Sequence, residues 1–268
     1  MIRAFAIGRI IEETMKYFRL AALILVVVLA GSFSARAQTE VTLVAPGSAR
    51  DALEQIIAGF ETKTGYKVKA TFGSGGKTKQ MVIRGEAIDV SIVQPPFDDV
   101  LASGNLVPAS QTPLASVALG IAVKKGMPKP DISTPEAVKR TLLAAKSITY
   151  PDPAVGGAAA VSFEAMIKKL GITEQLQPKI KLATSGPAGF ENTAKGDIEF
   201  GVGFVSEMVN PGIDIAGELP TELCPPTYFV GFLSSHPKDP AAAKALLDYL
   251  ASPAAAPAYR ALRMKPAH

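Results

Sequence analysis

The chain is poor in the side chains that build many reactive sites. Its 268 residues include one cysteine, Cys224, and two histidines, His236 and His268. One cysteine cannot form an internal disulfide, and this set is too small for a His/Cys metal cluster. A Ser-His-Asp triad is disfavoured because His236 lies in the loop sequence SSHPKD. We therefore expect neither a bound metal nor another cofactor.

A basic excess is also lacking outside the first residues. The chain has 28 basic residues, of which five lie in residues 1–37, and 24 acidic residues, of which two lie there. Residues 38–268 therefore keep 23 basic and 22 acidic side chains, a net charge of about +1. Such a balance does not indicate a nucleic-acid surface, so we expect no nucleic-acid partner.

Long apolar runs are absent except for one of 11 residues, LAALILVVVLA, at residues 20–30. Basic residues precede it and Ala35-Arg36-Ala37 follows, which is typical of a secretory signal peptide cleaved after Ala37. A membrane span needs about 20 residues, so an uncleaved anchor is the less favoured alternative. Met15 is an alternative start. Because Cys224 lies far from the cleavage site, we expect a free, soluble periplasmic product with no lipid anchor.

One pattern is present three times: an apolar strand ends in small residues and a helix begins there. The three junctions are VTLVAPGS before residue 51, KVKATFGSGG before residue 77, and SITYPDPAVGG before residue 158. Each places free backbone N–H groups at the positive end of a helix dipole, which suits a small anion. Three such junctions in one cleft would bind an oxyanion or a carboxylate.

Strands and helices alternate along the chain, which predicts an α/β fold with parallel strands and ligand sites at their carboxyl ends. We expect strands at residues 41–44, 66–72, 88–93, 116–124, 147–150, 179–182, 199–205 and 228–233. We expect helices at residues 51–64, 77–84, 98–103, from 134 onward, 158–170, 190–195, 240–250 and 253–262.

The alternation restarts after a loop at residues 125–131, which predicts two lobes. We expect residues 1–37 as the signal peptide, 38–120 as the first part of lobe 1, 121–226 as lobe 2, and 227–268 returning to lobe 1. A hinged ligand cleft would lie between the lobes, and we expect a monomer.

These segments carry a resemblance. The chain resembles the type II periplasmic solute-binding proteins, most of all their molybdate-binding branch, which also includes proteins like periplasmic aconitate isomerase. The matching stretches are VTLVAPGSARDAL (41–53), FETKTGYKV (60–68), TFGSGG (71–76), GEAIDV (85–90), DPA (152–154) and KGDIEFGVGF (195–204). The resemblance implies the two-lobed type II fold, with a ligand cleft between the lobes.

The resemblance also implies ligand residues: two loop hydroxyls, backbone N–H groups and a tyrosine. Ser48 matches the first hydroxyl, although it could instead cap a helix. Gly75, with Ser74 beside it, stands at the second. Backbone donors are implied at Ala158 and Gly186, and Phe204 stands where the tyrosine belongs.

The missing hydroxyls at Gly75 and Phe204 weaken the match to molybdate, because unmet oxygens in a buried site are costly. Lys77 and Arg50 could add charge near the first two junctions, which suits a carboxylate better. Further candidates at the cleft are Gln94, Tyr150 and Gly157.

The residues and the resemblance favour a binding protein that captures a small anion, molybdate-like by family, and delivers it to a membrane ABC permease. A periplasmic isomerase of a tricarboxylate, like aconitate isomerase, is the alternative, and a sensor component is a third. An isomerase needs a base, for which a lysine, Glu207 or Tyr150 are candidates. A cleft carboxylate with a raised pKa would favour the isomerase, whereas a cleft with only neutral donors would favour the importer component.

Overall fold

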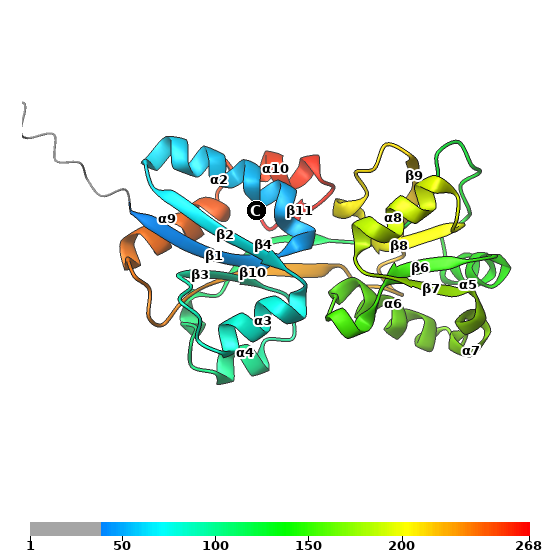
Figure 1. Cartoon of the computed structure of the whole chain (residues 1–268), viewed down its shortest axis with the longest axis horizontal. Helices are drawn as coiled ribbons and strands as arrows, with labels where there is room; N and C mark the ends of the chain where they lie inside the picture. Colours follow the sequence, from blue (N-terminus) through cyan, green and yellow to red (C-terminus); the bar gives the residue numbers. More distant parts are fainter. Residues whose placement is uncertain (1–38) are drawn as a thin grey trace, which may run out of the picture. The chain divides into compact units, whose positions relative to one another are not determined.

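A computed structural model describes residues 39–268. The expected signal peptide and its cleavage site lie outside the described residues. Two β-sheets with helices on their faces make up the fold (Figure 1), and Glu40–His268 form one compact unit. Over residues 39–268, no helix is both long and apolar enough to cross a membrane.

The first sheet has the strand order β11-β4-β10-β3-β1-β2. β1 lies between β2 and β3 and is parallel to both, whereas β10 is antiparallel to β3 and to β4. The bounds are β1 Glu40–Pro46, β2 Lys67–Gly73, β3 Val90–Val93, β4 Thr112–Val117, β10 Thr227–Leu233 and β11 Lys265–Pro266.

Helices cover both faces of this sheet (Figure 1). α2 (Arg50–Thr64), α9 (Pro240–Leu250) and α10 (Ala256–Ala261) pack together on one face, and α3 (Gly75–Ile83) and α4 (Asp98–Ala102) pack on the other. The apolar side chains of α2 are buried at helical spacing, as the sequence predicts, and Gly65 ends the helix with φ +76°.

The second sheet has the order β7-β6-β8-β5-β9, with β6 parallel to β7 and β8. Its strands are β5 Leu119–Lys124, β6 Ile148–Pro151, β7 Ile180–Ala183, β8 Phe200–Phe204 and β9 Ile213–Glu218. α8 (Gly186–Lys195) packs on β5, β6 and β8, as does α6 (Ala158–Lys169) from the other face (Figure 1). The remaining helices are α5 (Pro135–Ala144) and α7 (Thr173–Leu176).

The predicted strand over residues 116–124 is wrong in one respect. It is two strands, β4 and β5, separated at Ala118 and belonging to different sheets. The chain therefore enters the second sheet before residue 121, and it returns to the first with β10 at Thr227. Both strands are buried over most of their length, so the apolar sequence does not indicate where the chain passes from the first sheet to the second.

Helices α3 and α8 begin two or more residues earlier than predicted, and both changes matter at the cavity. α3 begins at Gly75 and α8 at Gly186, two and four residues ahead of expectation. Ser74 and Ser185 cap them, accepting hydrogen bonds from the backbone N–H of Lys77 (3.2 Å) and Ala188 (3.3 Å). Glycine and proline in these first turns hid the helix starts, because both are poor helix formers. β9, β11 and α7 were not predicted.

Candidate functional site

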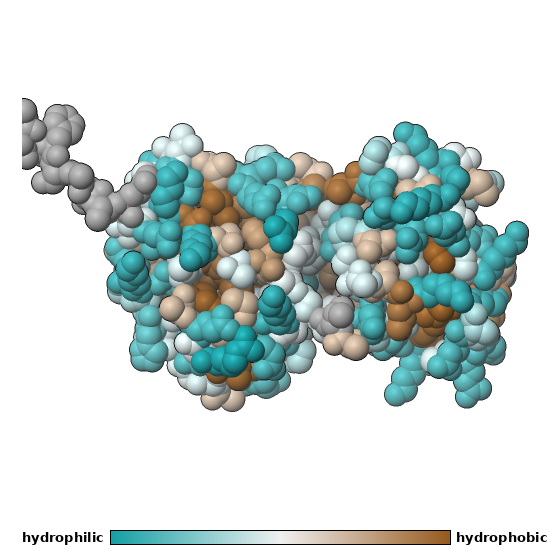
Figure 2. Space-filling view, in the orientation of Figure 1, coloured by the Kyte–Doolittle hydropathy of each residue, from teal (hydrophilic) through white to brown (hydrophobic). Residues whose placement is uncertain are grey.

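A cavity of about 590 Å³ lies where strands of both sheets end. Its walls are the segments that follow β1, β2 and β3 in the first sheet and β6, β7 and β8 in the second. Carboxyl ends of neighbouring parallel strands meet at one edge, which is where α/β sheets bind ligands. Figure 2 shows a hollow on the surface between the elements of the two sheets.

Two hydrogen bonds join the two sets of walls. The Ser206 hydroxyl donates to the Ser48 carbonyl over 2.8 Å, and the Gly76 N–H donates to the Gly156 carbonyl over 2.9 Å. Gly156 has φ +72°, and a Cβ on Gly76 would lie 3.2 Å from the Gly156 Cα. The positive φ of Gly156 favours glycine there, and a side chain at Gly76 would crowd the Gly156 backbone.

Unpaired backbone donors belong to helix starts that line the cavity. The N–H groups of Gly75, Ala158 and Ala159 have no acceptor among residues 39–268, and the first turn of any helix leaves such groups unpaired. Ser48 is not the cap of α2, which begins after Ala49, and its hydroxyl has no partner in the described chain. The capping alternative for Ser48 is therefore wrong, and its hydroxyl is available to a ligand.

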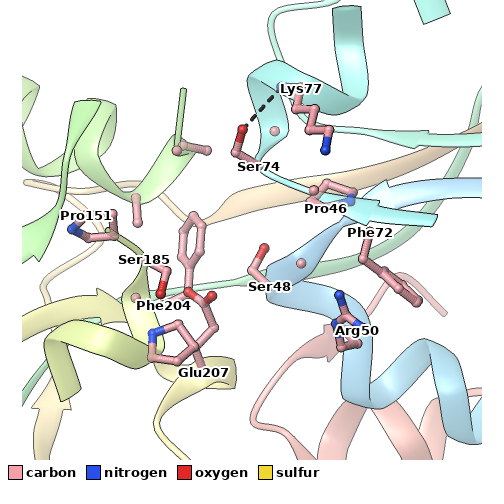
Figure 3. A pocket seen from close by; sticks show the side chains of 18 of the residues that line it. Pro46, Ser48, Arg50, Phe72, Ser74, Lys77, Pro151, Ser185, Phe204 and Glu207 are labelled. Carbon is pink, nitrogen blue, oxygen red and sulfur yellow. Dashed lines mark hydrogen bonds between the residues drawn. The ribbon is translucent and has the colours of Figure 1, made fainter. Parts of the chain in front are cut away.

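Two cationic side chains border the same cavity. The Lys77 stem lies against Gly73, where a Cβ would meet Lys77 Cδ at 3.1 Å, and its ammonium faces the cavity in Figure 3. No ion pair of Lys77 is formed in the described part of the chain. The Arg50 guanidinium stacks 4.6 Å from the centre of the Phe72 ring and lies 3.6 Å from Glu54. Lys77 is therefore more available than Arg50 to pair with a bound anion.

The carboxyl group of Glu207 is the most unusual feature of the site. It follows β8, faces the cavity near Ser48 and Ser185 (Figure 3), and forms no hydrogen bond with any described residue. Its room comes from Gly186, where a Cβ would lie 2.7 Å from Glu207 Oε2. Burial, and then the nearby charge of Asp51, raise the pKa of Glu207 to about 7.

This pKa predicts how stability changes with pH. The folded protein favours the protonated form of Glu207, so its stabilising contribution is complete below the ordinary pKa of 4.5 and is lost as pH rises through about 7. Between pH 5 and pH 8, the free energy of unfolding of the wild type should fall relative to that of Glu207→Gln by roughly 2 kcal/mol. Urea unfolding of both proteins at the two pH values measures this, and an equal difference at both would contradict the assigned pKa.

The cavity brings together nearly all of the residues expected at the cleft. Those that line it are Ser48, Arg50, Ser74, Gly75, Lys77, Gln94, Gly157, Ala158, Gly186 and Phe204. Tyr150 is the exception and is a correction: it is buried, does not line this cavity, and donates its hydroxyl to Glu164 over 3.1 Å. Burial and the Glu164 carboxylate raise the pKa of Tyr150, which makes it an unsuitable base.

Several lining residues were not singled out from the sequence, among them Phe72, Thr184, Ser185 and Pro187. The signal for three of them was present in TSGPAG at residues 184–189, where serine precedes a proline in the first helical turn. Phe72 carries no such signal, because an aromatic residue at the end of a strand is usually core.

Comparisons with known proteins agree with this architecture. The family model described as bacterial extracellular solute-binding protein matches residues 41–261. An aconitate isomerase from a Pseudomonas species is 32% identical over 240 residues, which cover 87% of this chain and 90% of that protein. A molybdate-binding protein of Rhodobacter capsulatus is 28% identical over 75% of this chain and 79% of its own.

Among solved structures, the periplasmic molybdate-binding protein of Azotobacter vinelandii superposes with a TM-score of 0.68. The match covers 84% of this chain and 98% of that one, at 18% sequence identity. At this identity the likeness is one of fold, so the α/β architecture with two sheets is that of periplasmic binding proteins.

Proposed function

This chain belongs to the family of bacterial extracellular solute-binding proteins, and we propose that its cavity binds a small polycarboxylate. We further propose that the protein isomerises this ligand, as an aconitate isomerase does. The observation that carries the proposal is Glu207, an unpaired carboxyl group in the cavity with a pKa of about 7. A base with a pKa near the working pH is what proton transfer from carbon requires. The likeness to the Pseudomonas aconitate isomerase supports it.

The charges and the size of the cavity favour a polycarboxylate over a tetrahedral oxyanion. Lys77 and Arg50 supply positive charge that a site of neutral donors does not need. Two hydroxyls of the molybdate-binding pattern are absent, since Gly75 and Phe204 replace them. A volume of about 590 Å³ is typical of cavities for small organic ligands.

In the proposed reaction, Glu207 carries one proton between two carbons of the substrate. Its carboxylate takes a proton from the methylene group of trans-aconitate, and the released electron pair forms a new carbon–carbon double bond. The electrons of the old double bond accept the proton back from Glu207 at the other end of the allylic system. Charge that develops on the adjacent carboxylate is stabilised by Lys77 and the free N–H groups at the starts of α3 and α6.

Capture of an anion for a membrane ABC permease is the second candidate. Unpaired N–H groups at helix starts favour it, since they hold an anion without chemistry, and relatives named as molybdate-binding proteins are consistent with it. Both candidates place a monomer in the periplasm. The hydrogen bonds from Ser206 and Gly76 to the opposite wall suit closure around a ligand in either case.

A melting-temperature panel on residues 38–268 tests the ligand class. The ligands are citrate, cis- and trans-aconitate, molybdate, tungstate, sulfate and phosphate. Ligand at about 100 times its dissociation constant adds roughly 2.7 kcal/mol of stability, a shift of several degrees. We expect a shift with the tricarboxylates, whereas a shift with molybdate or tungstate alone would support the second candidate and contradict the first.

A further inference from the structure

Gln94 is a buried polar side chain that the proposed reaction does not use. It follows β3 directly and is 2% exposed, yet it forms part of the wall of the main cavity. It also lines an adjoining cavity of about 380 Å³. Its amide Nε2 is a buried atom without a hydrogen-bond partner among residues 39–268. A buried unpaired donor lowers the stability of the folded protein, so its presence at position 94 calls for an explanation such as a ligand that pairs with it.

Gly75 and Gln94 occupy each other's space. A Cβ at position 75 would lie 2.6 Å from Gln94 Oε1, so any side chain there would displace the amide. The family resemblance places a ligand hydroxyl at position 75, where this chain has none. The Gln94 amide therefore occupies the space that a side chain at position 75 would need. It can do so because position 75 is glycine.

Two further donors line the same cavities as this amide, one from each set of walls, close to the hydrogen bond between Gly76 and Gly156. Gly75, Gln94 and Ala158 line both cavities. The N–H of Gly75 begins α3, a helix of 9 residues, and that of Ala158 begins α6, one of 12 residues, and neither has an acceptor in the described chain. The terminal amide torsion of glutamine is soft, so a half-turn brings Nε2 to the side of Oε1.

From this convergence we propose that Gln94, with the N–H groups of Gly75 and Ala158, forms a subsite for one carboxylate of the ligand. Three donors match the lone pairs of a carboxylate, and two of them lie at the positive ends of helices. Gln94 then determines specificity: the amide reaches a planar carboxylate where the family pattern has a serine hydroxyl. The inference rests on the proposed polycarboxylate ligand and adds to it the residue that selects it.

The test compares two substitutions of equivalent kind. Gln94→Leu removes the unpaired amide at the cavity. Thr149→Val removes a second unpaired buried atom of residues 39–268, Thr149 Oγ1, and Thr149 does not line the cavity. Isothermal titration with trans-aconitate should give a 10- to 100-fold weaker dissociation constant for Gln94→Leu. Thr149→Val should stay within twofold of the wild type. Both variants should melt at or above the wild-type temperature without ligand, since each loses an unsatisfied group.

Gly75→Ala gives an independent route to the same atoms. Its methyl group pushes the amide aside, so it should weaken trans-aconitate binding as Gln94→Leu does. The dissociation constant of the double variant for trans-aconitate should be at most about twice that of the weaker-binding single variant, because both substitutions act through one amide. Additive losses, or wild-type affinity in Gln94→Leu, overturn the subsite while leaving the proposed function intact. A wild type that binds no tricarboxylate overturns the proposed function and the subsite together.

Discussion

Glu207→Gln is expected to slow the interconversion of cis- and trans-aconitate by about 10³-fold while changing the affinity for either by less than about threefold. Glutamine keeps the size of the side chain and its place against Gly186, but it cannot accept a proton. Loss of turnover with binding retained is the signature of a group that acts on the reacting atoms. Steady-state kinetics and titration calorimetry on the same preparation measure both quantities.

Glu164→Gln is the matched control for that substitution. Glu164 is also a partly buried carboxyl group on the second-sheet side, but it accepts a hydrogen bond from Tyr150 and lies outside the cavity. Its turnover should stay near that of the wild type. The wild-type kcat/KM should rise with pH and be half-maximal near pH 7, since Glu207 must be ionised to act as the base. Full activity in Glu207→Gln would assign the base to another residue.

Lys77→Met should weaken tricarboxylate binding by about 10- to 100-fold, the second large effect. The ammonium of Lys77 faces the cavity, has no ion pair in the described chain, and would donate a charge-assisted hydrogen bond to a ligand carboxylate (Figure 3). Methionine keeps most of the apolar stem that lies over Gly73. Arg50→Met should cost less, because Arg50 already stacks on Phe72 beside Glu54.

Lys69→Met provides the comparison for Lys77→Met, since Lys69 is an exposed lysine on β2 that does not line the cavity. Its tricarboxylate affinity should match the wild type. Molybdate, if it binds at all, should be insensitive to Lys77→Met because neutral donors hold it. Equal tricarboxylate affinities of Lys77→Met and Lys69→Met would make Lys77 an ordinary surface charge.

Much of the fold was readable from the sequence because local signals agreed with it. Helix α2 shows its apolar face and its terminal Gly65, and the three strand-to-helix junctions lie where the small residues are. Strand order was not readable, since β10 joins β3 and β4 across more than a hundred residues. The change of sheet at Ala118 was hidden for the same reason: pairing partners, not residue types, decide it.

The site was readable in part. Ser48, Ser74 and Lys77 follow from the junction patterns, because small residues between a strand and a helix form a local sequence signal even where the exact helix start is hidden. The pairing of Gly186 with Glu207 and of Gly75 with Gln94 was not readable, since each joins residues about 20 positions apart or more through space that only the fold creates. Tyr150 lies in a strand next to the cavity-lining Pro151, yet its side chain points to Glu164 because successive residues alternate between faces.

The most direct test of the proposed isomerisation is wild-type turnover in D₂O. Protein comprising residues 38–268 is mixed with trans-aconitate, and proton NMR follows the signals of both isomers. We expect cis-aconitate to appear until equilibrium and the reverse reaction to reach the same ratio. Glu207→Gln should slow both directions by about 10³-fold. A tricarboxylate that raises the melting temperature but stays unchanged over hours would contradict the isomerase and leave a binding protein.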